Sequence, residues 1–308
     1  MVLGSFAAHS HPMRIALFAA LALVILSLES CKKDDDEDAP GGGGTSGPRL
    51  VLKFKFDSTQ VRLNNLGLPA TIPAGHGAQS PRFNKMSGHY VEFTPTATTL
   101  VGGGDVVYHA PETNLGGATA IDHDLGIAVG DGGEFLNIPL SDLSPGTYQY
   151  LRVSLAYQNY NIRFGALGQM YSGTIASFIG YNTYIGSYLV HDSTVTVNGN
   201  RAQGYWAFEV LNPPVATPVS TGQAAGTTVV NPLFATSPIP AGSCLATGAF
   251  ASPLVITGNE TSDVVILVSL STNKSFEWTE LDGDNVFEPI DGESVVDMGV
   301  RGLIPIVQ

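Results

Sequence analysis

Apolar and polar residues alternate with a period of two in this chain, and this pattern restricts its fold more than any other feature. In residues 50–57 every second residue is apolar, which places four large side chains on one face of an extended strand. They are Leu50, Leu52, Phe54 and Phe56. The pattern predicts further strands at 89–93, 105–109, 135–139, 149–155, 193–197, 204–211, 263–270 and 294–300.

Composition supports an all-β chain. It contains 36 Gly and 19 Pro, and charged residues make up 13%, about half the share in an average globular domain. This composition excludes a coiled coil or a helical bundle, and an apolar repeat of about 3.6 residues never persists for three turns outside the N-terminal apolar run. We therefore expect an antiparallel β-sandwich with no significant helix beyond a signal peptide.

The sequence predicts a folded body over residues 49–308, built as one elaborated sandwich or two packed together. Residues 210–259 contain no charged residue, which suggests an excursion packed as a loop and a subdivision near residue 210. Asn198 and Gly199 are a pair typical of tight hairpin turns, so we expect a turn there.

The first 30 residues have the features of a signal peptide. Met13 and Arg14 precede 13 uncharged, mostly apolar residues, 15–27, which are too few to span a bilayer of about 30 Å. Met13 is the expected start of translation. The alternative is an uncleaved signal anchor.

The signal peptide ends in a motif that resembles the lipobox of bacterial lipoproteins. Leu28 lies three residues before Cys31 and the small residue Ser30 lies directly before it, although Glu29 departs from the usual small or apolar residue. The resemblance implies cleavage before Cys31 and attachment of diacylglycerol to its sulfur.

The segment after the cysteine is similar to the surface-export signal of Bacteroidota lipoproteins. Residues 32–38 read KKDDDED, and the Gly-rich residues 39–48 read as a flexible tether. The resemblance as a whole, to a Bacteroidota outer-membrane lipoprotein, implies a body anchored through Cys31 that faces the cell surface. A soluble protein with a disordered acidic start is the alternative.

An acidic segment near the C-terminus is the first candidate site. Eight carboxylates lie between Glu277 and Asp297 with no Lys or Arg among them, a charge density that favours a bound cation. The spacing resembles a calcium loop of the EF-hand type with Asn285 at the turn position. The expected Ca²⁺ ligands are Glu280, Asp282, Asp284, Val286 (through its carbonyl), Glu288 and Asp291.

This register departs from the EF-hand pattern because Glu opens the loop and Asp closes it. Starting at Asp282 instead places Glu293 at position 12 but puts apolar residues in the middle. A solvated acidic hairpin without a metal is the alternative.

Histidines form the second candidate site. His76, His89, His109 and His123 fall within 48 residues, and imidazoles bind Zn²⁺ or Cu²⁺, but none has a diagnostic spacing. A metal carrier requires three of the four to converge on one point. The alternative is that the four histidines belong to no common site. Cys244 is expected to be buried and unreactive.

Tyrosines form the third candidate. Eight of the 11 lie between Tyr148 and Tyr188. An exposed ligand-binding face would contain Tyr157, Tyr160, Tyr171, Tyr181, Tyr184 and Tyr188. The alternative is ordinary packing within strands.

The sequence favours binding over catalysis. It contains no G-x-S-x-G, C-x-x-C, Walker or G-x-G-x-x-G motif in a suitable context, and its net charge of −13 argues against a nucleic-acid partner. We expect a surface-anchored adhesion or glycan-capture module, stabilised by Ca²⁺, with an extracellular glycan or protein partner. The alternatives are a glycan hydrolase with a distant carboxylate pair and a periplasmic Cu or Zn carrier.

Overall fold

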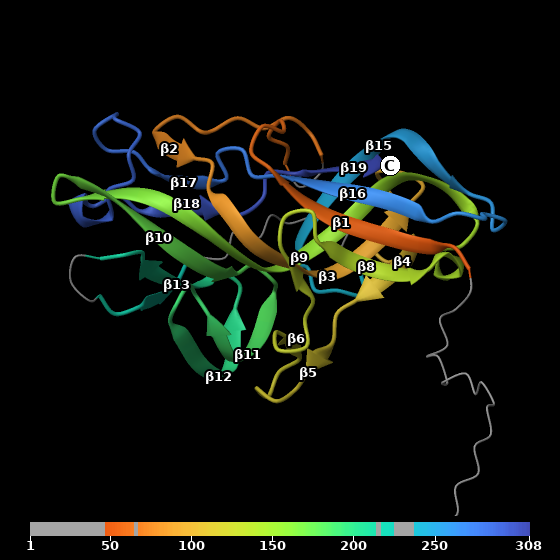
Figure 1. Ribbon diagram of the computed structural model, residues 1–308, viewed down its shortest axis with the longest axis horizontal. Helices are drawn as coiled ribbons and strands as arrows, with labels where there is room; N and C mark the ends of the chain where they lie inside the picture. The colour runs from red at the N-terminus through yellow and green to blue at the C-terminus, as the bar shows by residue number, and fades with distance from the viewer. Residues whose placement is uncertain (1–46, 65–66, 214–216, 225–236) are drawn as a thin grey trace, which may run out of the picture. The chain divides into compact units, whose positions relative to one another are not determined.

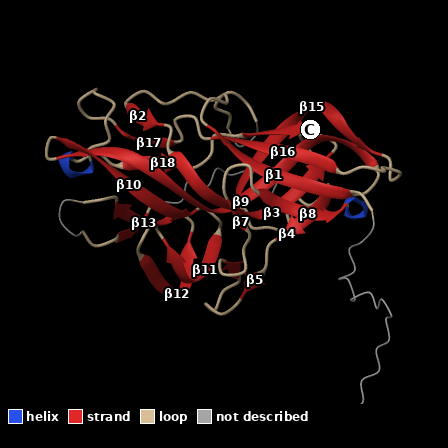
Figure 2. Cartoon of the chain, in the orientation of Figure 1, coloured by secondary structure: helices blue, strands red, loops and turns tan. Residues whose placement is uncertain are grey.

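The computed structural model describes residues 47–64, 67–213, 217–224 and 237–308. The expected signal peptide, Cys31 and nearly all of the tether lie outside these residues. Strands dominate the described part of the chain, in which helical structure is limited to 3₁₀ turns at Leu140–Asp142 and Pro289–Asp291 (Figure 2). The prediction of an all-β sandwich without significant helix is confirmed for this part of the chain.

The first sheet joins strands from opposite ends of the body, in the order β19-β16-β1-β8. Its strands are β1 (Arg49–Asp57), β8 (Glu134–Pro139), β16 (Val264–Ser271) and β19 (Leu303–Val307). β1 pairs antiparallel with β8 and parallel with β16 over eight residues, from Leu50 opposite Val264 to Asp57 opposite Ser271.

The second sheet is organised around β9 (Gly146–Ala166), the longest strand. β3 (Arg82–Thr94) pairs along one edge of β9. On the other edge, the first half of β9 pairs with β15 (Cys244–Ile256) and the second half with β10 (Gln169–Phe178). The sheet is completed by β4 (Asp105–His109), β7 (Ala128–Val129), β13 (Tyr205–Val210) and β14 (Ser220–Gln223).

Two smaller sheets flank this large sheet. One has the order β12-β11-β6-β5, and the other has the order β18-β17-β2. Their strands are β5 (Glu112–Thr113), β6 (Ala120–Asp122), β11 (Asn182–Leu189), β12 (Thr194–Ala202), β2 (His76–Gln79), β17 (Phe276–Thr279) and β18 (Val295–Met298).

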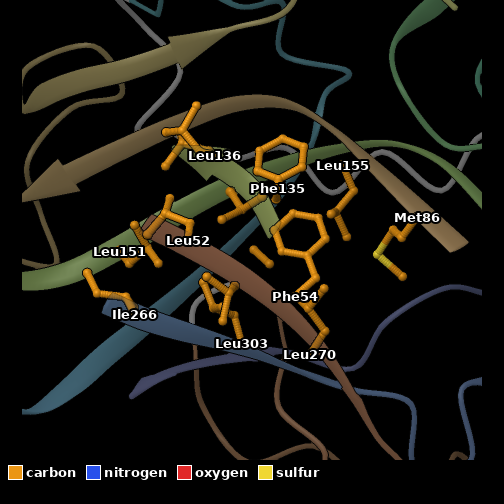
Figure 3. Packing of buried hydrophobic residues seen from close by; sticks show 14 of the residues in the cluster. Leu52, Phe54, Met86, Phe135, Leu136, Leu151, Leu155, Ile266, Leu270 and Leu303 are labelled. Atoms are coloured by element: carbon orange, nitrogen blue, oxygen red, sulfur yellow. The ribbon is translucent and has the colours of Figure 1, made fainter. Parts of the chain in front are cut away.

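The main core lies between the first sheet and one face of the large sheet. In Figure 3, side chains such as Leu52 and Phe54 of β1 meet Leu151 and Leu155 of β9. A second core on the opposite face packs the large sheet against β11 and β12, which lie below β10 in Figure 1. The large sheet is therefore the middle layer, and β9 is buried on both faces over most of its length.

Every strand predicted from the sequence is present, but two local predictions are wrong. Asn198 and Gly199 lie inside β12, where the ladder with β11 shifts register and Asn198 has φ of 49°; the turn into β13 is at Gly204, with φ of 93°. The uncharged residues 210–259 are not simply a packed loop, because 244–256 form β15 against the first half of β9.

Candidate functional site

The acidic loop, residues 280–293, connects β17 to β18 and brings several carboxylates together. Glu280, Asp282 and Glu293 each place an oxygen within 4.8 Å of the others, and so do Asp282, Asp284 and Glu288. Four of the expected Ca²⁺ ligands therefore lie in two groups that share Asp282. Asp291, an expected ligand, is in neither group. Glu293 is in the first group, although the loop register that starts at Glu280 does not include it as a ligand.

The shape of the acidic loop follows from its turn residues. Gly283 and Asn285 adopt left-handed backbone conformations with φ of 89° and 58°, as expected for Asn285 at the turn position. The Asp284 carboxylate accepts a hydrogen bond from the amide of Val286 at 2.7 Å, and the Glu280 carboxylate accepts one from Gly283 at 3.0 Å. These local bonds hold the carboxylates on a compact turn.

Negative charge in the acidic loop is not balanced by any ion pair within the described residues. Glu293 is buried, and its two oxygens accept hydrogen bonds from the amides of Leu281 and Glu288. Burial and the nearby Glu280 carboxylate raise the pKa of Glu293 above its usual range. Oε2 of Glu280 is buried and has no hydrogen-bond partner among the described residues. Oxygen atoms in this arrangement suit a hard cation such as Ca²⁺.

The histidines divide among three environments. His89 and His109 converge on Glu112, whereas Nδ1 of His76 lies 3.4 Å from Glu277. The ring of His123 packs against those of Tyr157, Phe178 and Tyr188. The requirement that three of the four histidines converge is therefore not met.

A carboxylate that the sequence analysis did not single out completes the His89 group. Nε2 of His89 lies 3.0 Å from Oε1 of Glu112, and Nε2 of His109 lies 3.5 Å from the same oxygen. The Tyr181 hydroxyl donates a hydrogen bond of 2.7 Å to that oxygen. Burial lowers the pKa of His89 to about 4, so its imidazole is neutral at neutral pH.

The expected exposed face of tyrosines does not form. Tyr157 and Tyr188 are buried in the second core and Tyr160 in the main core. Tyr171, Tyr181 and Tyr184 are only half-buried. Tyr157 and Tyr160 lie on β9, where both faces of the large sheet are covered, and Tyr188 lies on β11, which packs against the second core. The strand-packing alternative therefore accounts for these three buried rings.

An open pocket of about 600 Å³ was not predicted by the sequence analysis. Its lining includes Phe56, Ser58, Ser80, Arg82, Asn84 and Asp131. These residues come from segments far apart in the chain, so no local motif could reveal the pocket. Asp131 is the single carboxylate of the lining, and the Arg82 side chain is exposed.

Cys244 is half-buried at the start of β15 and packs beside the main core. Burial and the Asp297 carboxylate raise the pKa of its thiol to about 11, which disfavours the reactive thiolate.

No described segment forms a helix of sufficient length and apolarity to cross a bilayer. Comparisons of the chain with protein-family models, with curated proteins and with solved structures give no match.

Proposed function

We propose that this chain is a lipid-anchored extracellular binding module that captures glycans in the open pocket. The observation that carries the proposal is the chemistry of the lining. Phe56 supplies an aromatic ring, Arg82 supplies hydrogen-bond donors, and Asp131 and the amide oxygen of Asn84, whose nitrogen already donates to Asn159 and Asn161, supply acceptors. Sugar rings combine an apolar face with a rim of hydroxyls, so they suit a site with both kinds of group.

The same lining favours binding over hydrolysis. Glycosidases of the common types use two carboxylates that flank the scissile bond, at separations of about 5–9.5 Å. Asp131 is the only carboxylate that lines this pocket. The acidic loop contains several carboxylates, but none of them belongs to the pocket lining.

Replacing Arg82 by Ala is expected to weaken glycan binding by roughly tenfold or more, because a hydrogen bond from a charged group contributes about 1.5–3 kcal/mol. Gel retardation of the full chain by heparin, pectin and arabinoxylan would measure the effect, with the first two polysaccharides anionic and the third neutral. Arg163→Ala, which removes another exposed arginine outside the pocket, is the matched control.

Loss of retardation in both variants would mean that only total charge matters, and would contradict the proposal. Absence of retardation by all three polysaccharides in the unsubstituted chain would contradict capture of these glycan types.

The anchor part of the proposal depends on Cys31, outside the described residues. We expect Cys31→Ala to move the chain from the membrane fraction to the soluble fraction after cell lysis, because no acyl chain is then attached. Immunoblotting of the two fractions would measure this change. Retention of the Cys31→Ala chain in the membrane fraction would rule out lipid on this residue as the anchor.

Calcium has a structural role in this proposal. The acidic loop lies between β17 and β18, so a cation held by Glu280, Asp282, Asp284, Glu288 and Glu293 would neutralise repulsion and stiffen that end of the body.

A further inference from the structure

Three potential metal ligands meet where the large sheet lies beside the sheet of β5 and β6. His89 belongs to β3, His109 ends β4, and Glu112 begins β5. Their ligand atoms all lie within 4.8 Å of one another, and both imidazole Nε2 atoms approach Oε1 of Glu112.

The backbone places these side chains together through an irregularity in β3. Gly88 lies opposite Leu155 of β9 and Tyr90 lies opposite Ser154, so His89 is the additional residue of a β-bulge. A bulge redirects the side chain of its extra residue, and bulges are common beside functional sites. The next strand supplies the second imidazole, because His109 pairs with Tyr90 and the amide of Ala110 donates to the carbonyl of His89.

We propose that His89, His109 and Glu112 form an open binding site for a transition-metal dication of the Zn²⁺ class. Two ligands bound tetrahedrally at about 2.0–2.1 Å from Zn²⁺ lie about 3.3–3.4 Å apart. The two nitrogen-to-oxygen distances, 3.0 and 3.5 Å, bracket that value. Two histidines and one glutamate are also a ligand set that binds Zn²⁺ with a fourth position left free.

Partial exposure of two of the three side chains gives a metal a path into the site. His89 is completely buried, whereas the side chains of His109 and Glu112 are 39% and 25% exposed. Tyr181 donates to the glutamate and orients it, as groups outside the first ligand shell do in metal sites. The site therefore has a fixed inner ligand and two outer ligands that solvent reaches.

Without a metal, the same contacts form a network in which Glu112 accepts hydrogen bonds from Tyr181 and His89, while Nε2 of His109 lies 3.5 Å from the same oxygen. That network and a metal site make opposite predictions for added Zn²⁺. A metal site binds one equivalent of Zn²⁺, and this binding depends on all three ligands. A hydrogen-bond network that only stabilises the fold binds no Zn²⁺.

Equilibrium dialysis of the full chain against Zn²⁺, in millimolar Ca²⁺ to occupy the acidic loop, would test the proposal. We expect one equivalent of Zn²⁺ to bind, and both His109→Ala and Glu112→Gln to weaken that binding more than about tenfold, because even partners outside the first shell change affinity by about 10–100-fold. Loading with Co²⁺ should give the intense visible absorption of a tetrahedral site, and each variant should lose it.

The matched control is His191→Ala, which removes an exposed histidine outside this group and should leave binding unchanged. Thermal melts of each variant establish that the chain remains folded; His109 and Glu112 are partly exposed, so these substitutions are tolerable. Binding that persists in both His109→Ala and Glu112→Gln, or no saturable binding in the unsubstituted chain, would overturn the proposal. Neither result bears on glycan capture, since no residue of this group lines the open pocket.

Discussion

Arg152→Met is expected to lower the free energy of unfolding by about 3–5 kcal/mol, the usual cost of removing one partner from a buried ion pair. Arg152 on β9 lies directly opposite Glu92 on β3, their charged groups are 3.4 Å apart, and both side chains are completely buried. Without the guanidinium, the Glu92 carboxylate would remain in the interior with no opposite charge within contact distance.

This pair also fixes the connection between β3 and β4. The guanidinium of Arg152 donates to the carbonyls of Ala97 and Thr99, while Glu92 accepts from the amides of Gly102 and Gly104. The two ends of the ion pair therefore bind the same segment of backbone, residues 97–104, and the substitution removes both the charge balance and two of these hydrogen bonds.

Urea denaturation would measure the loss of stability. The double variant Glu92→Gln/Arg152→Met should be more stable than Arg152→Met alone, because it leaves no unpaired buried charge. Arg163→Ala, which removes an exposed arginine from the same strand, should change stability by less than about 0.5 kcal/mol. A loss below about 1 kcal/mol in Arg152→Met would mean that water reaches Glu92 and that the pair is not structurally important.

Removing Ca²⁺ is expected to produce the second largest change. A ligand present at 100 times its dissociation constant stabilises the folded state by about 2.7 kcal/mol, which for a body of this size is about 5 °C in Tm. We therefore expect thermal melts of the full chain to shift downward by about that amount when EDTA replaces excess Ca²⁺.

The double variant Asp282→Asn/Asp284→Asn should lose this shift. In EDTA the double variant should be at least as stable as the unsubstituted chain, because the substitutions also remove repulsion among carboxylates that no described ion pair balances. Asp192→Asn, at a side chain that is 88% exposed and outside both acidic groups, is the control. An identical response to Ca²⁺ in the unsubstituted chain and the double variant would exclude the acidic loop as the calcium site.

Sequence alternation predicted β1 and β4. It did not predict β10, β11 or β15, in which small residues such as Gly and Ser interrupt the pattern. The position of β15 depends on β9, about 90 residues earlier in the chain, as its pairing of Cys244 with Leu155 shows. No local pattern carries that information.

The candidate sites also differ in whether their residues are close together in the sequence. The acidic loop is local, so spacing alone predicted that carboxylates meet there and that Asn285 occupies a turn; four of the expected ligands lie in the two groups, and a bound Ca²⁺ stays a prediction. The tyrosines of β9 are not predictable from spacing, because an irregularity beside Ala156 places Tyr157 in the second core although Leu155, two residues earlier, lies in the main core. Glu112 lies three residues after His109, but its approach to His89 follows from the pairing of β4 with β3, which spacing alone does not reveal.

The parallel ladder of β1 and β16 has a consequence for how this chain reaches its native state. Eight residues of β1, from Leu50 to Asp57, each pair with a residue 214 positions later, as Leu50 does with Val264. Contacts of such high sequence separation slow folding, since a long loop must close before any of them contributes stability. β8 protects one edge of β1 early in synthesis, but the other edge keeps unpaired amide and carbonyl groups until residue 264 has been made. A chain that stops before this point presents an apolar strand with an open edge, which favours aggregation.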